Sequence, residues 1–296
     1  MRALCIALLL VATSRAEAQV QDLGHRFPAG AGLDAGTQPD EGVYAGDRLV
    51  AFSSSRIRDR NGNVIPIAGL DLDAYANVFG VAGTKQLGEM YASIAFAVPL
   101  VKLSVSSEAP ESSVDRLGLG DVFVQPIKLG TRLSRLDVVA AYSFYVPTAQ
   151  GQRAGVGRPQ WSEQVSAGGT VFFDDQRGWR ISALASYLHS HKKRGIDITR
   201  GDTVLVQGGA GGRVLRVIDV GVAGYALWQV TDDRGADLPP VLAGSRERAF
   251  GLGPEVDVSV PALRSRVVAR FTWDLDGRAR PVGTMFVVGV SVLAFR

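Results

Sequence analysis

A period of two dominates the hydrophobic pattern of the chain from about residue 42 onward. In the stretch 90–100 every even position is apolar, and the stretches 138–146, 220–228 and 267–273 alternate in the same way. A helical spacing of apolar residues is weak throughout. The pattern therefore predicts an all-β chain of about twelve strands. The expected strands run over 43–58, 69–82, 88–101, 119–129, 136–147, 161–173, 179–188, 202–214, 218–229, 248–260, 265–274 and 284–295.

The connections between these strands alternate in length. The short ones lie at 83–87, 130–135, 174–178, 215–217 and 261–264, and the longer polar ones at 102–118, 148–160, 189–201 and 230–247. Short turns on one rim and long loops on the other are typical of an outer-membrane barrel. A secreted β-sandwich gives no reason for this alternation. The predicted fold is a single antiparallel transmembrane β-barrel of the outer-membrane type, with both chain ends on the short-turn side.

Aromatic residues on the apolar faces support this fold. They gather near strand ends, where rings form the interfacial girdles of a membrane barrel. The members are Trp161, Phe173, Trp179, Tyr187, Trp228, Phe250, Trp273 and Phe286. The chain also ends in a strand with Phe295 next to last, as in substrates of the barrel-assembly machinery, although Arg296 follows. We expect outer-membrane lipid and lipopolysaccharide to surround the protein.

The first 41 residues read differently from the rest. Arg2 precedes an apolar run of ten residues, 3–12, and small residues follow at 16 and 18. This pattern predicts a signal peptide over 1–18 and export to the outer membrane of a Gram-negative bacterium. Residues 19–41 show no period and predict a flexible N-terminal segment, which leaves 42–296 for the barrel.

Composition excludes several classes of function. The 32 basic and 29 acidic residues give a formal charge of +3, which does not favour nucleic-acid binding. Cys5, the one cysteine, lies in the predicted leader, and the chain has only three histidines. We therefore expect no disulfide framework, no metal centre and no cofactor. Asp174-Asp175 and Asp232-Asp233 are typical of turns that form local hydrogen bonds.

The alternation also predicts which side chains line the barrel lumen, and carboxylates outnumber basic groups among them. The candidates are Asp71, Asp73, Tyr75, Asn77, Tyr91, Asp121, Tyr145, Arg213, Asp219, Tyr225, Glu255 and Arg270. Turn lengths place Glu255 opposite Arg270 and Arg213 opposite Asp219 on neighbouring strands. Such pairs either pack a narrow barrel or form a selectivity element of a pore. The tyrosines either stack on aromatic solutes or fill space.

Two local motifs have alternative interpretations. His189 and His191 flank Ser190 in a basic run, which raises a lipid-modifying enzyme as one hypothesis. No triad with a supporting carboxylate is visible, so an exposed loop that touches anionic lipopolysaccharide is the favoured interpretation and we expect no catalytic residues. The glycine-rich run 208–212 lies inside an expected strand, where it gives space for curvature or for a neighbouring side chain.

Several motifs resemble those of the outer-membrane proteins grouped as the MetA-pathway of phenol degradation family. The matching elements are Gly118-Leu119-Gly120-Asp121 with Pro126 and Leu129-Gly130, Tyr145-Val146-Pro147-Thr148, Trp161-Ser162 with Gly168-Gly169-Thr170, and Trp228-Gln229 with Asp232-Asp233. Ala149 stands where that family usually has glycine. The resemblance covers about residues 40–296. It implies an outer-membrane β-barrel that transports small, often aromatic or hydrophobic, compounds, and it supplies no catalytic residues.

The expected function is passive diffusion of small solutes through the barrel. Twelve strands lie between the filled eight-stranded barrels and the wide water channels of sixteen or more. A narrow channel, or one plugged by the 19–41 segment or by an inward loop, is therefore expected. The alternatives are a closed barrel that displays loops or stabilises the membrane and, as a third, the lipid-modifying enzyme.

Overall fold

A computed structural model describes residues 28, 30–109, 111–148, 156, 160–240 and 242–295. The predicted signal peptide, 1–18, lies outside these residues. The described part is almost entirely β-structure. Its strands are β1 Gly42–Arg58, β2 Asp71–Leu87, β3 Met90–Glu108, β4 Glu111–Leu119, β5 Val122–Arg132, β6 Leu136–Val146, β7 Ser162–Phe172, β8 Arg180–Ser190, β9 Thr203–Leu215, β10 Ile218–Gln229, β11 Arg248–Val260, β12 Ser265–Arg278 and β13 Arg280–Phe295.

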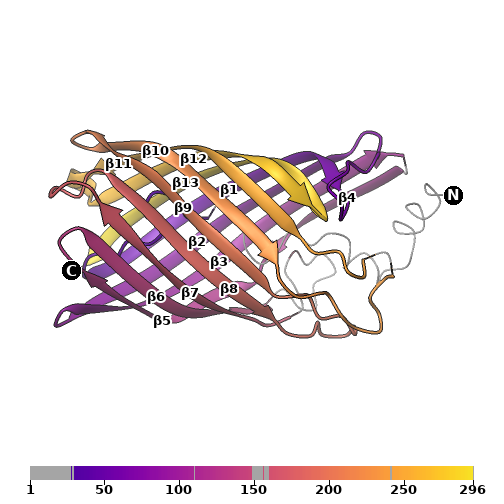
Figure 1. Cartoon of the computed structure of the whole chain (residues 1–296), viewed down its shortest axis with the longest axis horizontal. Coiled ribbons are helices and arrows are strands. Elements are labelled where there is room, and N and C mark those ends of the chain that lie inside the picture. The colour runs from indigo at the N-terminus through magenta and orange to yellow at the C-terminus, as the bar shows by residue number, and fades with distance from the viewer. Residues whose placement is uncertain are drawn as a thin grey trace.

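The strands close into a barrel. Each described strand pairs antiparallel with its neighbours, and β1 pairs with β2 on one side and with β13 on the other. The pairing of β2 with β3 completes the ring. Figure 1 shows the resulting cylinder of tilted strands. Within the described residues, no helix has the length and apolar character needed to cross a membrane.

The strands β4 and β5 share one position in the wall. β3 pairs with β5 up to Ala97 and with β4 from Leu100 onward, so β4 continues the line of β5. At the break, the Gly120 N–H donates to the Pro99 carbonyl at 2.8 Å. The thirteen strands therefore make a twelve-stranded barrel, which confirms the predicted fold class. The sequence prediction of a long loop at 102–118 was wrong, because there β3 and β4 form a hairpin that extends the wall.

The two rims differ as predicted, apart from two tight connections on the loop side, the β3–β4 hairpin and Ala279 between β12 and β13. The predicted long connection 148–160 lies mostly outside the described residues. The turn-side rim carries the short connections 88–89, 133–135, 173–179, 216–217 and 261–264, together with the C-terminal end of β13. The loop-side rim carries the long connections 59–70, 191–202 and 230–247. In Figure 1 the turn-side rim lies at the end marked C.

Asp174 illustrates how a turn-side connection is built. Its carboxylate accepts hydrogen bonds from the Gly178 N–H at 2.9 Å and the Trp179 N–H at 2.6 Å. These backbone donors stabilise the charged form and hold the pKa of Asp174 below its usual value. Asp174 thus forms local hydrogen bonds, as the sequence indicates, whereas Asp175 pairs with Arg135 at 2.6 Å.

The outer face of the barrel is apolar. Several of its exposed aromatic rings lie near the two rims, with Phe173 and Trp179 near the turn side and Trp161, Tyr187 and Trp273 near the loop side. This arrangement matches the aromatic girdles of membrane barrels. The apolar residues between them include Phe79, Val81, Ile94, Phe96, Val222 and Leu252.

Val222 tests the lipid-facing assignment. It lies in the middle of β10 with its side chain exposed on the outer face. We expect Val222→Arg to lower the free energy of unfolding by about 2–4 kcal/mol, the cost of a cation near the bilayer midplane. Urea unfolding in lipid vesicles measures the difference. The control Leu263→Arg lies in a turn-side connection and should change little. Equal stability of the two variants would contradict the assignment.

Candidate functional site in the barrel interior

Residues 30–40, which we call the inner segment, run through the turn-side half of the barrel interior. They are fixed to the wall mainly by side chains rather than by strand pairing. The Gly36 N–H donates to Ser182 Oγ at 2.7 Å, and Thr37 Oγ1 lies 2.9 Å from Thr170 Oγ1. Deeper in the barrel, the Ala31 N–H donates to Gln207 Oε1 at 3.0 Å. The segment predicted to be flexible is thus held inside the barrel over these residues.

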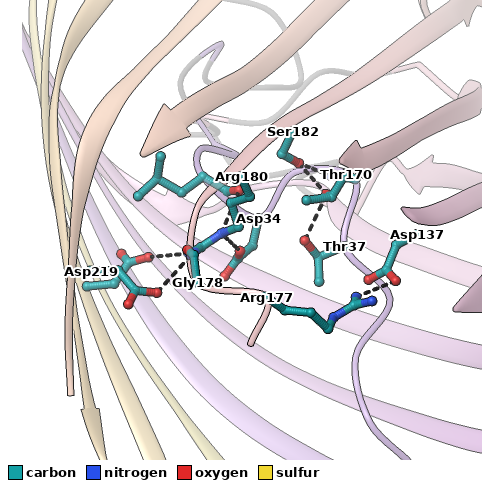
Figure 2. A network of polar contacts seen from close by, with 12 residues as sticks. Asp34, Thr37, Asp137, Thr170, Arg177, Gly178, Arg180, Ser182 and Asp219 are labelled. Atoms are coloured by element: carbon teal, nitrogen blue, oxygen red, sulfur yellow. Dashed lines mark hydrogen bonds and ion pairs between the residues drawn. The ribbon is translucent and has the colours of Figure 1, made fainter. Parts of the chain in front are cut away.

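Asp34 is held between two arginines of the wall. Arg180 Nε lies 2.6 Å from one carboxylate oxygen, and Arg266 donates to the other. Arg180 also reaches Asp219 at 2.9 Å, and Figure 2 shows its guanidinium between the two carboxylates. Arg266 in turn contacts Asp257. Because a guanidinium forms paired, charge-assisted hydrogen bonds with carboxylates, this network fixes the inner segment firmly.

Leu33 occupies a pocket lined by glycines, which have no side chains to fill it. The residue is fully buried. A Cβ at Gly221 would lie 2.7 Å from Leu33 Cδ2, and one at Gly211 or Gly209 would lie 3.0 or 3.1 Å from the same atom. The run 208–212 therefore gives space to a neighbouring side chain, which is one of the two explanations drawn from the sequence. Leu33, from the same chain as the wall, fills this pocket.

The inner segment leaves the barrel at the turn-side rim. Gln38 donates its backbone N–H to Asp137 at 3.1 Å, and Arg132 contacts Asp40 at 2.6 Å. Lys128 donates to the Thr37 carbonyl at 3.2 Å. Asp40 is 62% exposed whereas Asp34 is 28% exposed, so the contacts at this rim are more hydrated than those inside.

Part of the loop-side half of the interior is apolar. A cluster of inward-facing residues from several neighbouring strands fills it, and Phe52 and Leu205 are among its fully buried members. The cluster consists of Val50, Phe52, Leu72, Ala74, Ala76, Leu205, Tyr225, Leu227, Ala249, Met285 and Val287. The apolar cluster thus lies between the charged groups around the inner segment and further polar groups near the loops.

A second charged network lies at the loop-side end of this apolar cluster. Arg280 contacts Glu247 at 3.0 Å, and Arg200 contacts the other oxygen of Glu247 at 2.9 Å. The Tyr225 hydroxyl donates to Asp274, whose second oxygen accepts the Gly283 N–H at 3.1 Å. The loops 191–202 and 230–247 are tied together above it, where the Thr199 N–H donates to the Arg234 carbonyl at 2.7 Å.

The structure places most of the predicted lumen residues in the interior. Glu255 pairs with Arg270 at 2.6 Å and Arg213 with Asp219 at 3.0 Å, in the registers that the turn lengths predict. Tyr145 is buried beside Phe123, with ring centroids 5.3 Å apart. The interior members of the predicted set are Tyr91, Asp121, Tyr145, Arg213, Asp219, Tyr225, Glu255 and Arg270.

Four predicted lumen residues lie on the outer face of the barrel instead of the inner face. Asp71, Asp73, Tyr75 and Asn77 point outward from β2, whereas the residues between them are buried in the apolar cluster. The first half of β2 carries its apolar residues at even positions and the second half at odd positions. A strand without a bulge keeps one phase. The structure keeps the phase that turns Phe79 to the lipid, so the sequence-based assignment of these four residues is corrected.

Sequence reasoning found Arg270 but missed the other basic groups around the inner segment. The wall there also carries Arg48, Arg180 and Arg266, and these arginines face Asp219, Glu255 and Asp257. The expected excess of carboxylates is therefore not found at this level of the barrel. The alternation in 179–188 places Arg180 on the face opposite to the apolar one, so Arg180 could have been predicted as a lumen residue from the sequence. Nothing in the sequence indicates that Asp34 lies between Arg180 and Arg266.

The histidines lie on the outer side of the loop-side rim. His189 Nδ1 lies 2.9 Å from Asp202, His191 Nε2 lies 3.0 Å from Glu163, and the two rings are 5.1 Å apart. Ser190 is buried on the opposite face of β8, away from both rings. Among the described residues, no group of three or more histidine, cysteine, aspartate or glutamate side chains could hold a metal ion.

The fold and its interior define a β-barrel of the outer-membrane type with an internal N-terminal segment. A family model described as "Putative MetA-pathway of phenol degradation" matches residues 54–288. The chain belongs to this family, which confirms the resemblance in the sequence. No curated protein sequence matches the chain.

Solved structures show the same architecture. The chain is similar to the COG4313 outer membrane channel from Pseudomonas putida F1, with a TM-score of 0.75 and 13% identity over 88% of this chain and 97% of that one. It is also similar to the transport unit of the autotransporter AIDA-I from Escherichia coli, with a TM-score of 0.54 and 10% identity over 99% and 96% of the two chains. At these identities the likeness shows the fold.

Proposed function

We propose that the protein is an outer-membrane channel through which small apolar or aromatic solutes diffuse passively. The observation that carries this proposal is the apolar cluster in the loop-side half of a closed barrel. A barrel that served only as a rigid membrane body has no need of an apolar cluster enclosed between charged groups in its interior. An apolar solute entering from the loop side would replace contacts among these side chains and gain by leaving water.

The family and the fold support the same conclusion. The matching family is described by a pathway of phenol degradation, and the Pseudomonas putida structure is described as an outer membrane channel. Neither name is that of an enzyme, and the opposite faces of Ser190 and the histidines argue against a hydrolytic site.

In this proposal the inner segment closes the channel at rest. It occupies the turn-side half of the interior, so passage requires residues 30–40 to move. Its contacts are side-chain hydrogen bonds and ion pairs, which break and re-form without disturbing the barrel wall. The interior residues Tyr91, Tyr145 and Tyr225 would line the route, and Glu255 with Arg270 would set its charge preference.

The remaining partners follow from the outer surface. The aromatic residues near both rims would contact the headgroup region of the membrane, and the run 191–194 would meet lipopolysaccharide. Phe295, at the turn-side end of β13, would be presented to the barrel-assembly machinery during folding.

Planar-bilayer recording tests the proposal. The chain without residues 1–18 is refolded, its folding is checked by heat-modifiable electrophoretic mobility, and single-channel currents are recorded. We expect discrete conductance steps with long closed periods, since the inner segment must leave first. A folded protein that never conducts, with or without the inner segment, would contradict the proposal and favour a closed structural barrel.

A further inference from the structure

Leu33 and Asp34 present two different groups to the barrel wall, an apolar side chain and, next to it, a carboxylate. We propose that the place they fill is a binding site for an amphipathic carboxylic acid, a small molecule with a carboxylate beside an apolar or aromatic group. Leu33 and Asp34 occupy this site until such an acid displaces them. The inference rests on the proposed function only for the route by which the acid arrives.

The carboxylate half of the site is formed by two arginines from different strands. Arg180 on β8 and Arg266 on β12 each bind one oxygen of Asp34. Both are also tied to wall carboxylates, Arg180 to Asp219 and Arg266 to Asp257, so their guanidinium groups stay in place when Asp34 leaves. A planar carboxylate of a ligand would meet the same donors in the same orientation.

The charge balance of the wall favours an anion at this position. Besides the two arginines that bind Asp34, the neighbouring wall carries Arg48, whose side chain donates to the Gly30 carbonyl at 2.7 Å, and Arg270, which pairs with Glu255. When Asp34 is removed, the wall keeps these four arginines and only three carboxylates among the described residues nearby. Arg48 is exposed, whereas Arg180 and Arg266 each lose a carboxylate contact when Asp34 leaves. An incoming carboxylate restores these two contacts and a neutral molecule does not.

The apolar half of the site is the glycine pocket around Leu33. Gly209, Gly211 and Gly221 have no side chains there, and the space they leave is filled by one branched aliphatic group. The pocket adjoins the carboxylate half, since Gly221 and Asp219 lie on the same strand two residues apart. The Arg180 Nε, which binds Asp34, also donates to the Leu33 carbonyl at 3.3 Å.

The occupant is exchangeable because it is not part of the sheet. The backbone of Leu33 is held by its N–H donating to Glu255 Oε1 at 3.1 Å, and that of Gly36 by Ser182. The pairing of every wall strand is complete without these contacts. A ligand that binds the arginines and the glycine pocket can therefore replace the inner segment while the barrel stays folded.

Equilibrium binding to the folded protein in detergent micelles tests the inference independently of conduction. The probe is benzoate, compared with benzamide, which has the same shape without the charge. We expect the variant Leu33→Ala/Asp34→Ala, which empties both halves of the site, to bind benzoate at least about tenfold more tightly than the unmodified protein, because it removes the competing groups. Benzamide should bind neither protein.

The control variant Asp40→Ala removes the same charge from the same segment at the exposed rim, where Asp40 contacts Arg132 rather than the proposed site. It removes one anchor of the inner segment without emptying the site, so it should raise benzoate binding far less than Leu33→Ala/Asp34→Ala does. Adding Arg266→Gln to the emptied variant should abolish binding, and heat-modifiable mobility checks that each variant is folded. Benzamide binding equal to that of benzoate, an equal gain in Asp40→Ala, or binding that survives Arg266→Gln would overturn the inference. A folded protein that binds benzoate but never conducts would contradict the channel and leave this site standing.

Discussion

Removal of residues 19–40 is expected to turn an intermittently conducting barrel into a steadily conducting one. The described part of this stretch occupies the turn-side half of the interior and is held by Arg180, Arg266 and Arg132. A preference of only about 3 kcal/mol for the bound segment leaves it outside the barrel roughly 1% of the time. We therefore expect the time-averaged conductance in a planar bilayer to rise by about two orders of magnitude.

A second variant separates loss of chain bulk from loss of the anchoring side chains. Replacing residues 30–40 by a glycine-serine stretch of equal length keeps the bulk but removes Leu33, Asp34 and Asp40. The barrel should then flicker between conducting and closed levels, with a mean conductance between those of the full chain and the deletion. If the full chain and the deletion conduct equally, the inner segment does not close the barrel.

Glu255→Ala is expected to destabilise the barrel strongly. Glu255 is buried on β11, pairs with Arg270 at 2.6 Å and accepts the Leu33 N–H at 3.1 Å. The alanine removes one partner of a buried ion pair, which typically costs about 3–5 kcal/mol. Urea unfolding in lipid vesicles should show this loss in the free energy of unfolding.

Two controls accompany this prediction, one that breaks an exposed ion pair and one that replaces both members of the buried pair by an uncharged residue. Asp232→Ala breaks an exposed contact with Arg246 in a loop and should change stability little. Replacing Glu255 and Arg270 together by methionine should recover most of the loss, because both charges of the buried pair then leave the interior together. A Glu255→Ala barrel as stable as the Asp232→Ala barrel would show that the interior pair is well hydrated.

Much of the wall follows from local sequence alone. A side chain in a strand alternates between two faces, so the phase in 218–229, 248–260 and 265–274 places Asp219, Glu255 and Arg270 together. Turn lengths then set the register of each hairpin, as the observed pairs show. The reasoning failed in β2, where the apolar phase changes along the strand and only pairing with β1 and β3 decides which phase is kept.

The sequence by itself determined the class of fold, the number of barrel strands, the two unequal rims and the cross-strand ion pairs, because these depend on neighbours along one chain or across one turn. Only the tertiary structure decided what fills the barrel. The contact of Asp34 with Arg180 and Arg266 joins residues far apart in the sequence across an enclosed space. No period or turn length encodes such a contact, since it arises only when the sheet has closed around the segment.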